Sequence, residues 1–389
     1  MDSIYEEPLV DLRELRKKNQ AATVSTLRNE GLDAIIVTAE DSVRYLACEK
    51  LYHQNDWWQD HYAAILTSNG QFWRDRYDPY GGEAGWDYST PFAGSTIIPD
   101  RWADVLKQAL QNLNIRGEAK IGLDQLSFNL VEQLHNQLPS VTFVPFMRAF
   151  LKQRAVKNDL EIDLLREAAR VTDIGMQTGV IVGSTPGVRQ NEVFAKMLSA
   201  MTEAGSELTP HNSIIASGKE SLKDYLISDR RIKEGELYRF DVGCMIEGYH
   251  GDAGRVGYCG RTKASKETKE LYQASYGCLM AGIKKVHPGV RGSEIDEACR
   301  EYLKEVGYPG YKKWSGHGIG ARECEYPLLA PRSELRELEM ELKPGMVIGI
   351  EPTAHKADLG AMVMEDMVLV TENGCEKITK TGYLDYLLS

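Results

Sequence analysis

Five side chains in the second half of the sequence have the chemistry of metal ligands. Four are carboxylic acids in or beside apolar segments and the fifth is a histidine between glycines: Asp241, Asp252, His317, Glu351 and Glu365. A carboxylate is costly to bury among apolar residues unless a positive charge lies beside it. Mixed carboxylate and imidazole ligands suit divalent manganese, iron, cobalt or zinc. The set therefore predicts a metal centre and leaves the identity of the metal open.

The two aspartates stand in neighbouring predicted strands. Apolar runs over about 236–245 and 248–258 are separated by a short turn, so we expect a hairpin that brings Asp241 and Asp252 alongside each other. Two adjacent carboxylates repel unless they share a proton or a cation. From these two residues alone the alternative is equally favoured, namely an ion pair with a nearby arginine: Arg239 or Arg255.

The other three residues stand in separate segments. His317 lies in the run GHGIG, which we expect to be a loop whose small residues leave space for the imidazole. Glu351 ends one apolar strand, and Glu365 stands inside another over about 362–370, with Asp366 on the opposite face because side chains alternate. Four such acids and one histidine in one half of the chain are better explained by metal binding than by packing.

The sequence divides into two regions that differ in their predicted secondary structure. The 389 residues suggest about two or three domains. The first 150 residues alternate predicted helices with short apolar strands, which indicates an α/β domain, and residues 146–157 read as a basic connector. Beyond that point a pair of helices followed by strands occurs twice. This order predicts a pseudo-repeat around one central sheet.

Composition excludes several classes of function. The net charge of −11 argues against a nucleic-acid partner, because phosphate binding needs a basic surface. The sequence shows neither the roughly 18–20 consecutive apolar residues of a membrane span nor the apolar core of a signal peptide near its start. Seven scattered cysteines suit free thiols better than a disulfide framework. We therefore expect a cytoplasmic protein without a nucleic-acid or membrane partner.

The order of the motifs resembles the pita-bread superfamily of prolidase, aminopeptidase P, methionine aminopeptidase and creatinase. The resemblance rests on Asp241 and Asp252, then GHGIG, GMVIGIEP and MED, and it covers roughly residues 155–380. It implies an α/β (α+β) fold: a creatinase-like N-terminal α/β domain over 1–154, then a pita-bread metallohydrolase domain over 155–389. In that second domain, pseudo-repeated helix pairs are expected around a curved antiparallel sheet.

The same resemblance implies roles for the five residues. Asp241 would chelate one of two divalent ions, His317 and Glu351 would hold the other, and Asp252 and Glu365 would bridge the two. Two such ions lower the pKa of a water between them and polarise a carbonyl, and Glu351 is then the candidate for proton transfer. We expect a dinuclear-metal-dependent hydrolase of an amide C–N bond in a small substrate, with an Xaa-Pro dipeptide as the default.

Three outer positions depart from the peptidase pattern. Cys324 stands where a second histidine is expected, Asp224 where another histidine falls, and Val363 where an arginine is usual. A neutral thiol does not replace an imidazole. A thiolate could attack or bind metal if its pKa were lowered, and a small space-filling residue is the alternative. His355, four residues after Glu351, is a candidate substitute for the missing imidazole, with an exposed loop histidine as the alternative. The changes predict retained metal chemistry on an altered substrate.

Residues outside the metal set are expected to contact substrate. Tyr225 adjoins Asp224, and Trp58 and His61 lie in an aromatic, polar segment of the N-terminal half. Members of the superfamily commonly dimerise so that this segment covers the partner's site, which implies a homodimer. Packing at a domain interface would explain Trp58 and His61 nearly as well.

Two other functional classes remain. Dimethylsulfoniopropionate lyases of this fold keep the metals and replace the second histidine, but they carry an extra aspartate where this chain has Gly243. Binding-only relatives typically lose metal ligands, and this chain keeps all five. A hydrolase is therefore favoured over both.

Overall fold

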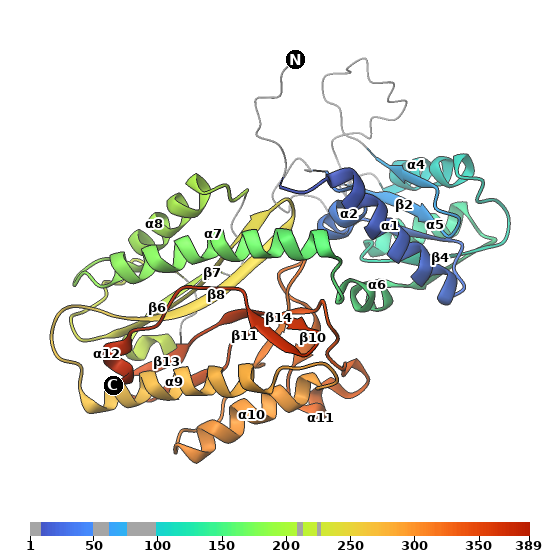
Figure 1. The fold of residues 1–389 in the computed structure, drawn as a ribbon. Helices are drawn as coiled ribbons and strands as arrows, with labels where there is room; N and C mark the ends of the chain where they lie inside the picture. The colour runs from blue at the N-terminus through green and yellow to red at the C-terminus, as the bar shows by residue number, and fades with distance from the viewer. Residues whose placement is uncertain (1–8, 50–61, 76–98, 208–212, 224–226) are drawn as a thin grey trace. The chain divides into compact units, whose positions relative to one another are not determined.

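The chain divides into two units, Met1–Arg154 and Ala155–Ser389. The computed structural model describes residues 9–49, 62–75, 99–207, 213–223 and 227–389 (Figure 1). Within these segments, none of the helices is long and apolar enough to cross a membrane.

The first unit is built on a five-stranded mixed sheet with the strand order β3-β2-β1-β4-β5. Neighbours β1–β2 and β2–β3 are antiparallel, whereas β1–β4 and β4–β5 are parallel. The strands are β1 (Ala34–Val37), β2 (Ala64–Thr67), β3 (Phe72–Arg74), β4 (Ala119–Leu123) and β5 (Val141–Pro145). The helices are α1 (Leu12–Asn29), α2 (Glu40–Ala47), α4 (Pro99–Asn112), α5 (Phe128–Gln137) and α6 (Met147–Arg154). The alternation of helix and strand predicted from the sequence is confirmed.

Helix α6 occupies most of the segment predicted to be a connector, and the boundary between the two units lies at its end, at Arg154. Although this segment is rich in basic residues, Phe150 and Arg154, four residues apart, form a buried face of the helix. The Phe150 ring lies 5.7 Å from that of Tyr45, edge to face, and Arg154 Nη1 donates to Asp41 Oδ2 at 2.7 Å. Burial of an arginine that is paired in this way supports a helix, not an exposed linker.

The second unit places its strands between two pairs of helices (Figure 1). Helices α7 (Asp159–Gly183) and α8 (Gln190–Glu203) pack against each other, as do α9 (Lys266–Lys285) and α10 (Gly292–Glu305). Helix α7 lies along β7 and β8, while α9 packs on β11, β12 and β13. Shorter helical segments are η1 (Gly218–Leu222), α11 (Arg332–Leu335), η2 (Arg336–Leu338) and α12 (Asp385–Leu388).

The strands of this unit form three hydrogen-bonded sheets, and every pairing within them is antiparallel. Their orders are β6-β7-β8, β10-β9-β11-β14-β15 and β12-β13. The strands are β6 (Ile214–Ser217), β7 (Leu237–Ile246), β8 (Tyr249–Tyr258), β9 (Gly316–Gly318), β10 (Glu325–Leu329), β11 (Val347–Ile350), β12 (Thr353–Lys356), β13 (Gly360–Val363), β14 (Asp366–Thr371) and β15 (Gly374–Lys377). The antiparallel architecture is as predicted, but the expected single sheet is divided.

A repeated tetrapeptide marks the predicted pseudo-repeat. The sequence PGVR precedes both α8 and α10. In the first copy Gly187 N donates to Ile232 O at 2.8 Å, and in the second Gly289 N donates to Leu342 O at 2.9 Å. Both glycines have φ near +86°, at 85° and 87°, a conformation that other residues adopt with strain. The two halves of the unit therefore start the second helix of each pair from equivalent loops.

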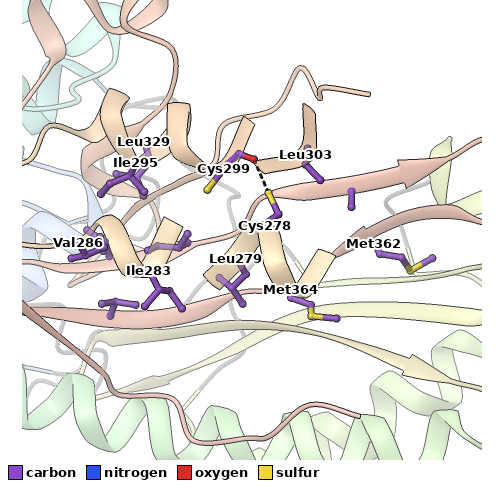
Figure 2. Close-up of a cluster of buried hydrophobic side chains, with 14 of the residues drawn as sticks. Cys278, Leu279, Ile283, Val286, Ile295, Cys299, Leu303, Leu329, Met362 and Met364 are labelled. Carbon is purple, nitrogen blue, oxygen red and sulfur yellow. Dashed lines mark hydrogen bonds between the residues drawn. The ribbon is translucent and has the colours of Figure 1, made fainter. Parts of the chain in front are cut away.

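An apolar core supports the second half of the repeat. Figure 2 shows Leu279 and Ile283 of α9 and Ile295 of α10 in one cluster of buried side chains, which also contains Met362 and Met364 from the strand layer. The Cys278 thiol donates to the Cys299 carbonyl at 3.2 Å in the same cluster. All seven cysteines lie in described segments, and none of them forms a disulfide, as predicted.

Candidate metal centre

The β7–β8 hairpin brings the two aspartates to one face of the sheet. Asp241 is opposite Gly254, and Asp252 is opposite Gly243, so the two carboxylates are diagonal neighbours. Side chains two residues apart on a strand share a face, which directs both carboxylates the same way. The ion-pair alternative is not what the structure shows for Arg255, whose Nη2 atom donates to Asp366 Oδ1 at 2.7 Å.

His317 lies on the short strand β9, between β10 and β11, and not on a loop as predicted. The absence of side chains on both flanking glycines permits this close pairing, because a Cβ on Gly316 or Gly318 would lie 2.0 Å from a backbone oxygen. His317 Nδ1 is 3.1 Å from Gly318 O, and a carbonyl can only accept. The proton is therefore assigned to Nδ1, which leaves the Nε2 lone pair directed at the acids.

Glu365 occupies a break in what the sequence predicts as one continuous strand. The segment instead forms β13, which pairs with β12, and β14, which pairs with β11 and β15. At the break, Glu365 N donates to Gly254 O at 2.9 Å. This bridge seats Glu365 against the β7–β8 hairpin. The predicted continuous strand is wrong because the two halves of the segment pair with different partners.

The five predicted residues meet at two adjacent positions. Ligand atoms of Asp252, His317 and Glu365 lie within 4.8 Å of one another, and so do those of Asp241, Glu351 and Glu365. We call the first the imidazole position and the second the all-acid position. Atoms about 2.1 Å from one cation lie within about 4 Å of each other, so a small contraction suffices for coordination. Glu365 belongs to both positions.

The distances from His317 to two of the acids show that the imidazole position and the all-acid position adjoin. His317 Nε2 is 3.8 Å from Asp252 Oδ2 and 3.6 Å from Glu351 Oε1. Glu351 is 4% exposed and follows β11, where its backbone N–H donates to Ser315 O at 2.8 Å. Glu351 therefore lies near His317, as the resemblance implied, while also grouping with Asp241.

The acids of this cluster can all be ionised together only if positive charge lies beside them. Burial raises the pKa of Asp252 and Glu365 well above their ordinary values, and each is raised further by neighbouring carboxylates. Burial also raises the pKa of Asp241, with Glu351 adding to the shift and Lys313 opposing it. Carboxylates buried together destabilise one another when ionised, and divalent cations remove that cost.

One atom of the cluster has no partner of its own. Within the described part of the chain, Glu365 Oε1 is buried and accepts no hydrogen bond. Space for this oxygen depends on Gly349, where a Cβ would lie 2.4 Å from it. A buried carboxylate oxygen without a hydrogen-bond donor is costly, and a cation would satisfy it. The residues present thus fit a pair of divalent ions.

A second buried network lies behind Glu365. Arg255 Nη1 donates to Glu365 O at 2.6 Å, while Arg255 Nη2 donates to Asp366 Oδ1. Asp366 also accepts from Thr379 Oγ1 at 2.7 Å and from the Tyr383 hydroxyl. Asp366 therefore faces away from the metal positions, as predicted. The network fixes the backbone of Glu365 from behind.

Two residues near the acids were not predicted from the sequence. Lys313, on the loop before β9, donates to Glu351 Oε2. Glu323 has its pKa raised to about 7, first by burial and then by the charges of Asp241 and Glu351. A pair of lysines before a tryptophan and one acid in a polar loop are typical of solvated surface, so the sequence carried no specific signal for either residue.

Cys324 is close enough to the cluster for its charges to act on the thiol. Burial raises the pKa of Cys324 to about 12, and the charges of Glu351 and Glu323 contribute. The surroundings therefore keep the thiol neutral and do not favour the thiolate alternative.

A buried ion pair supports the strand that follows this cysteine. Glu325 Oε1 accepts from Lys157 Nζ at 2.6 Å, and both side chains are inaccessible to solvent. Nearby, Glu161 accepts from the Tyr249 hydroxyl at 3.1 Å, and burial raises the pKa of Glu161 to about 7.

The remaining predicted residues are placed as follows. His355 is half-buried on β12 opposite Ala361, and among described residues it does not join the side chains that meet at either position. Val363 is buried on β13 opposite Thr353. The other predicted residues lie outside the described segments: Trp58, His61, Asp224 and Tyr225.

Acids and one imidazole gathered at two adjoining cation positions, on antiparallel strands between helix pairs, define a metallohydrolase. Residues 163–372 match Metallopeptidase family M24, and residues 21–156 match the Creatinase/Prolidase N-terminal domain. The chain belongs to metallopeptidase family M24 and is a metal-dependent hydrolase of amide bonds. The predicted superfamily, fold class and enzyme class are confirmed.

Similar proteins agree with this assignment. An Xaa-Pro dipeptidase of Pyrococcus furiosus is 33% identical over 258 residues, which is 66% of this chain and 72% of the relative. An Xaa-Pro dipeptidase structure from Bacillus anthracis has a TM-score of 0.78 at 26% identity and covers 95% of this chain and 99% of its own. A prolidase structure from Pyrococcus furiosus has a TM-score of 0.74 at 26% identity, covering 92% and 99%. The lyase-like and binding-only alternatives are not favoured.

Proposed function

We propose that Asp241, Asp252, His317, Glu351 and Glu365 hold two divalent cations and that the protein hydrolyses the amide bond of an Xaa-Pro dipeptide or a similar small substrate. Manganese, iron, cobalt and zinc all suit the donor set. The observation that carries the proposal is the sharing of Glu365 between both positions, with one of its oxygens lacking a hydrogen-bond donor.

The chemistry divides between the ions and the chain's own groups. When bound, a pair of divalent ions polarises the substrate carbonyl and lowers the pKa of water. Glu351 is the proposed proton-transfer residue, because its Oε1 atom faces His317 and its Oε2 atom faces Lys313. His317, with its proton assigned to Nδ1, contributes a neutral nitrogen donor at Nε2.

The substrate assignment rests on the relatives named Xaa-Pro dipeptidase and prolidase. Cys324, a neutral thiol, stands where those peptidases are expected to have an imidazole. We therefore propose that Xaa-Pro cleavage is slow compared with an enzyme that has the imidazole. His355 stays a candidate for part of that role, as do Asp224, Tyr225, Trp58 and His61 for substrate contact.

Assembly and location complete the proposal. A homodimer is proposed from the family resemblance, in which the segment containing Trp58 and His61 covers the partner's site. A cytoplasmic location is proposed because seven free thiols suit a reducing compartment.

The test is metal reconstitution followed by a substrate panel. Protein treated with chelator is reloaded with manganese, cobalt, zinc or iron(II), and bound metal is measured before each assay. We expect about two ions per chain, and hydrolysis of Xaa-Pro dipeptides in preference to dipeptides without proline. A chain that binds no ion would overturn the metal centre. A fully loaded chain that cleaves only non-peptide C–N substrates would overturn the dipeptide assignment alone.

A further inference from the structure

Arg239 brings a buried positive charge to the side of the candidate metal centre. It precedes Asp241 by two residues on β7, so the two side chains leave the same face of the strand. Arg239 is 3% exposed, close to the 4% of Glu351. Burial raises the pKa of Asp241, and the charge of Arg239 is among the effects that lower it. The guanidinium is therefore a cation beside the proposed ligands and no more buried from solvent than they are.

A neighbouring segment contacts the guanidinium. Arg239 Nη2 donates to Ser221 O at 3.4 Å, in segment η1. The Ser221 hydroxyl donates to Gly218 O at 2.7 Å and accepts from Ala361 N of β13 at 2.9 Å. Segment η1 thus joins β7 to β13 next to Arg239, which places the guanidinium at one side of the site.

Arg239 differs in chemistry from the other cation near the acids. Lys313 donates to Glu351, which is a proposed ligand, and the Lys313 side chain is 39% exposed. An ammonium is a point charge, whereas a planar guanidinium can bind a carboxylate through two parallel hydrogen bonds. With five N–H donors, a guanidinium can do so while it keeps a bond to the protein. Arg239 is therefore the better carboxylate ligand of the two.

We propose that Arg239 binds the terminal carboxylate of the dipeptide and makes the enzyme specific for substrates that end in a free carboxyl group. The inference rests on the proposed function. One residue of a peptide spans at most about 3.6 Å, so the carboxylate of a dipeptide lies close to the scissile carbonyl. Residues two apart on a strand are separated by about 6.6 Å, and an arginine side chain is long enough to cover part of that distance. A carboxylate that passes Asp241 would thus meet a guanidinium.

The first experiment needs only wild-type, full-length protein loaded with Mn²⁺. It compares Ala-Pro with Ala-prolinamide, which lacks the charge of the carboxylate. We expect kcat/KM to be about 100-fold higher for Ala-Pro, because loss of one partner of a buried charge pair commonly has an effect of this size or larger. Similar values for the two substrates would overturn the proposal.

A variant then tests whether Arg239 is the source of this preference. Arg239→Gln should lower kcat/KM for Ala-Pro about 100-fold, mainly through KM, and leave that for Ala-prolinamide unchanged. The matched control is Arg261→Gln, which removes the same charge from an exposed position just after β8 and should change neither value. Equal losses on both substrates in Arg239→Gln, at equal metal content, would show that Arg239 only supports the site, and the proposal would be overturned.

Binding of a reaction product gives a readout without turnover. L-proline has the carboxylate and L-prolinamide does not, and calorimetric titration of each into Mn²⁺-loaded protein measures its Kd. Arg239→Gln should bind L-proline about 100-fold more weakly than wild type does. Equal affinities for L-proline would overturn the proposal. Binding of L-proline that depends on Arg239, in a chain that cleaves no Xaa-Pro dipeptide, would instead overturn the proposed function and support carboxylate binding by Arg239.

Discussion

At the scale of single residues, Glu365 connects the two candidate metal positions. It contributes to both groups of ligand atoms, and its backbone is held by Gly254 and Arg255. Removal of any other carboxylate would leave either the imidazole position or the all-acid position with all three of its side chains. Removal of Glu365 would deprive both positions of a side chain. Glu365 therefore makes the sharpest test of a shared site.

Glu365→Gln is expected to weaken binding of both ions by more than about 100-fold, since even residues behind a metal ligand contribute about 10–100-fold. Calorimetry with Mn²⁺ measures the stoichiometry. The control is Glu372→Gln, which removes the same charge from an exposed position seven residues later. Retention of two tightly bound ions in Glu365→Gln would contradict the shared-ligand geometry.

Cys324→His restores an imidazole at the altered position. We expect Xaa-Pro dipeptidase activity to rise about tenfold or more, because a positioned general acid or base typically contributes at least 100-fold. The change is measured as kcat/KM at equal metal content. Cys324→Ser keeps a small side chain without an imidazole and should show no gain. An unchanged rate in Cys324→His with metal bound would count against the missing imidazole as the cause of slow cleavage.

At the scale of elements, the buried pair Arg255–Asp366 joins β8 to β14. The Arg255 side chain is 2% exposed and that of Asp366 is fully buried, and each has further hydrogen-bond partners. A fully bonded buried pair specifies one register, whereas loss of one member leaves an uncompensated charge. This network is the reason why Glu365 meets the hairpin at a defined point.

Asp366→Ala should lower the free energy of unfolding by about 3–5 kcal/mol, because it leaves the Arg255 guanidinium buried without its partner. Urea denaturation measures the change. For comparison, Arg166→Met breaks a pair with Glu376 that is about 40% exposed and should cost less than about 1 kcal/mol. Equal costs for the two variants would show that the buried network is not what stabilises this junction.

Gly349 on β11 provides the space that Glu365 Oε1 occupies. Gly349→Ala is expected to displace that oxygen and to weaken Mn²⁺ binding about 10–100-fold with the fold retained, as for other changes that move a ligand. Metal titration and circular dichroism together check this outcome. Gly374→Ala introduces the same methyl group where nothing lies within 4 Å, and it should bind metal like wild type.

At the scale of the whole molecule, the pseudo-repeat aligns ligands from distant parts of the chain. Asp241 and Glu351 each follow by six residues a glycine of positive φ, Gly235 at 84° and Gly345 at 86°. Both acids belong to the all-acid position. Equivalent loops in the two halves thus deliver equivalent acids to one site.

This concentration of buried acids predicts how stability depends on pH. A carboxyl group whose pKa is higher in the folded than in the unfolded protein stabilises the fold at low pH, and that contribution is lost as pH rises from the unfolded pKa to the folded pKa. Asp241, Asp252 and Glu365 are all raised in the metal-free chain. Glu161 is raised from 4.5 to about 7.

Metal-free protein should therefore lose stability steadily between about pH 4.5 and pH 7, by about 3 kcal/mol from Glu161 alone. Thermal unfolding at several pH values, with and without Mn²⁺, measures the slope. Metal should remove the part due to the ligands, and Glu161→Gln should remove much of the rest, because Glu161 is not a ligand. An increase in stability over this pH range in chelator-treated protein would contradict the conclusion that these acids are buried in their protonated form.

The sequence alone predicted the five proposed ligands and most helices and strands, because hydrophobic periodicity reports which residues are locally buried. Several acids that are buried close together need a cation or shared protons, so metal binding could be inferred before their contacts were known. Only the tertiary structure decided that Glu365 stands at a strand break, that His317 lies on a strand and that Lys313 reaches Glu351. Those outcomes depend on pairings between segments far apart in the chain, whose geometry local patterns do not contain.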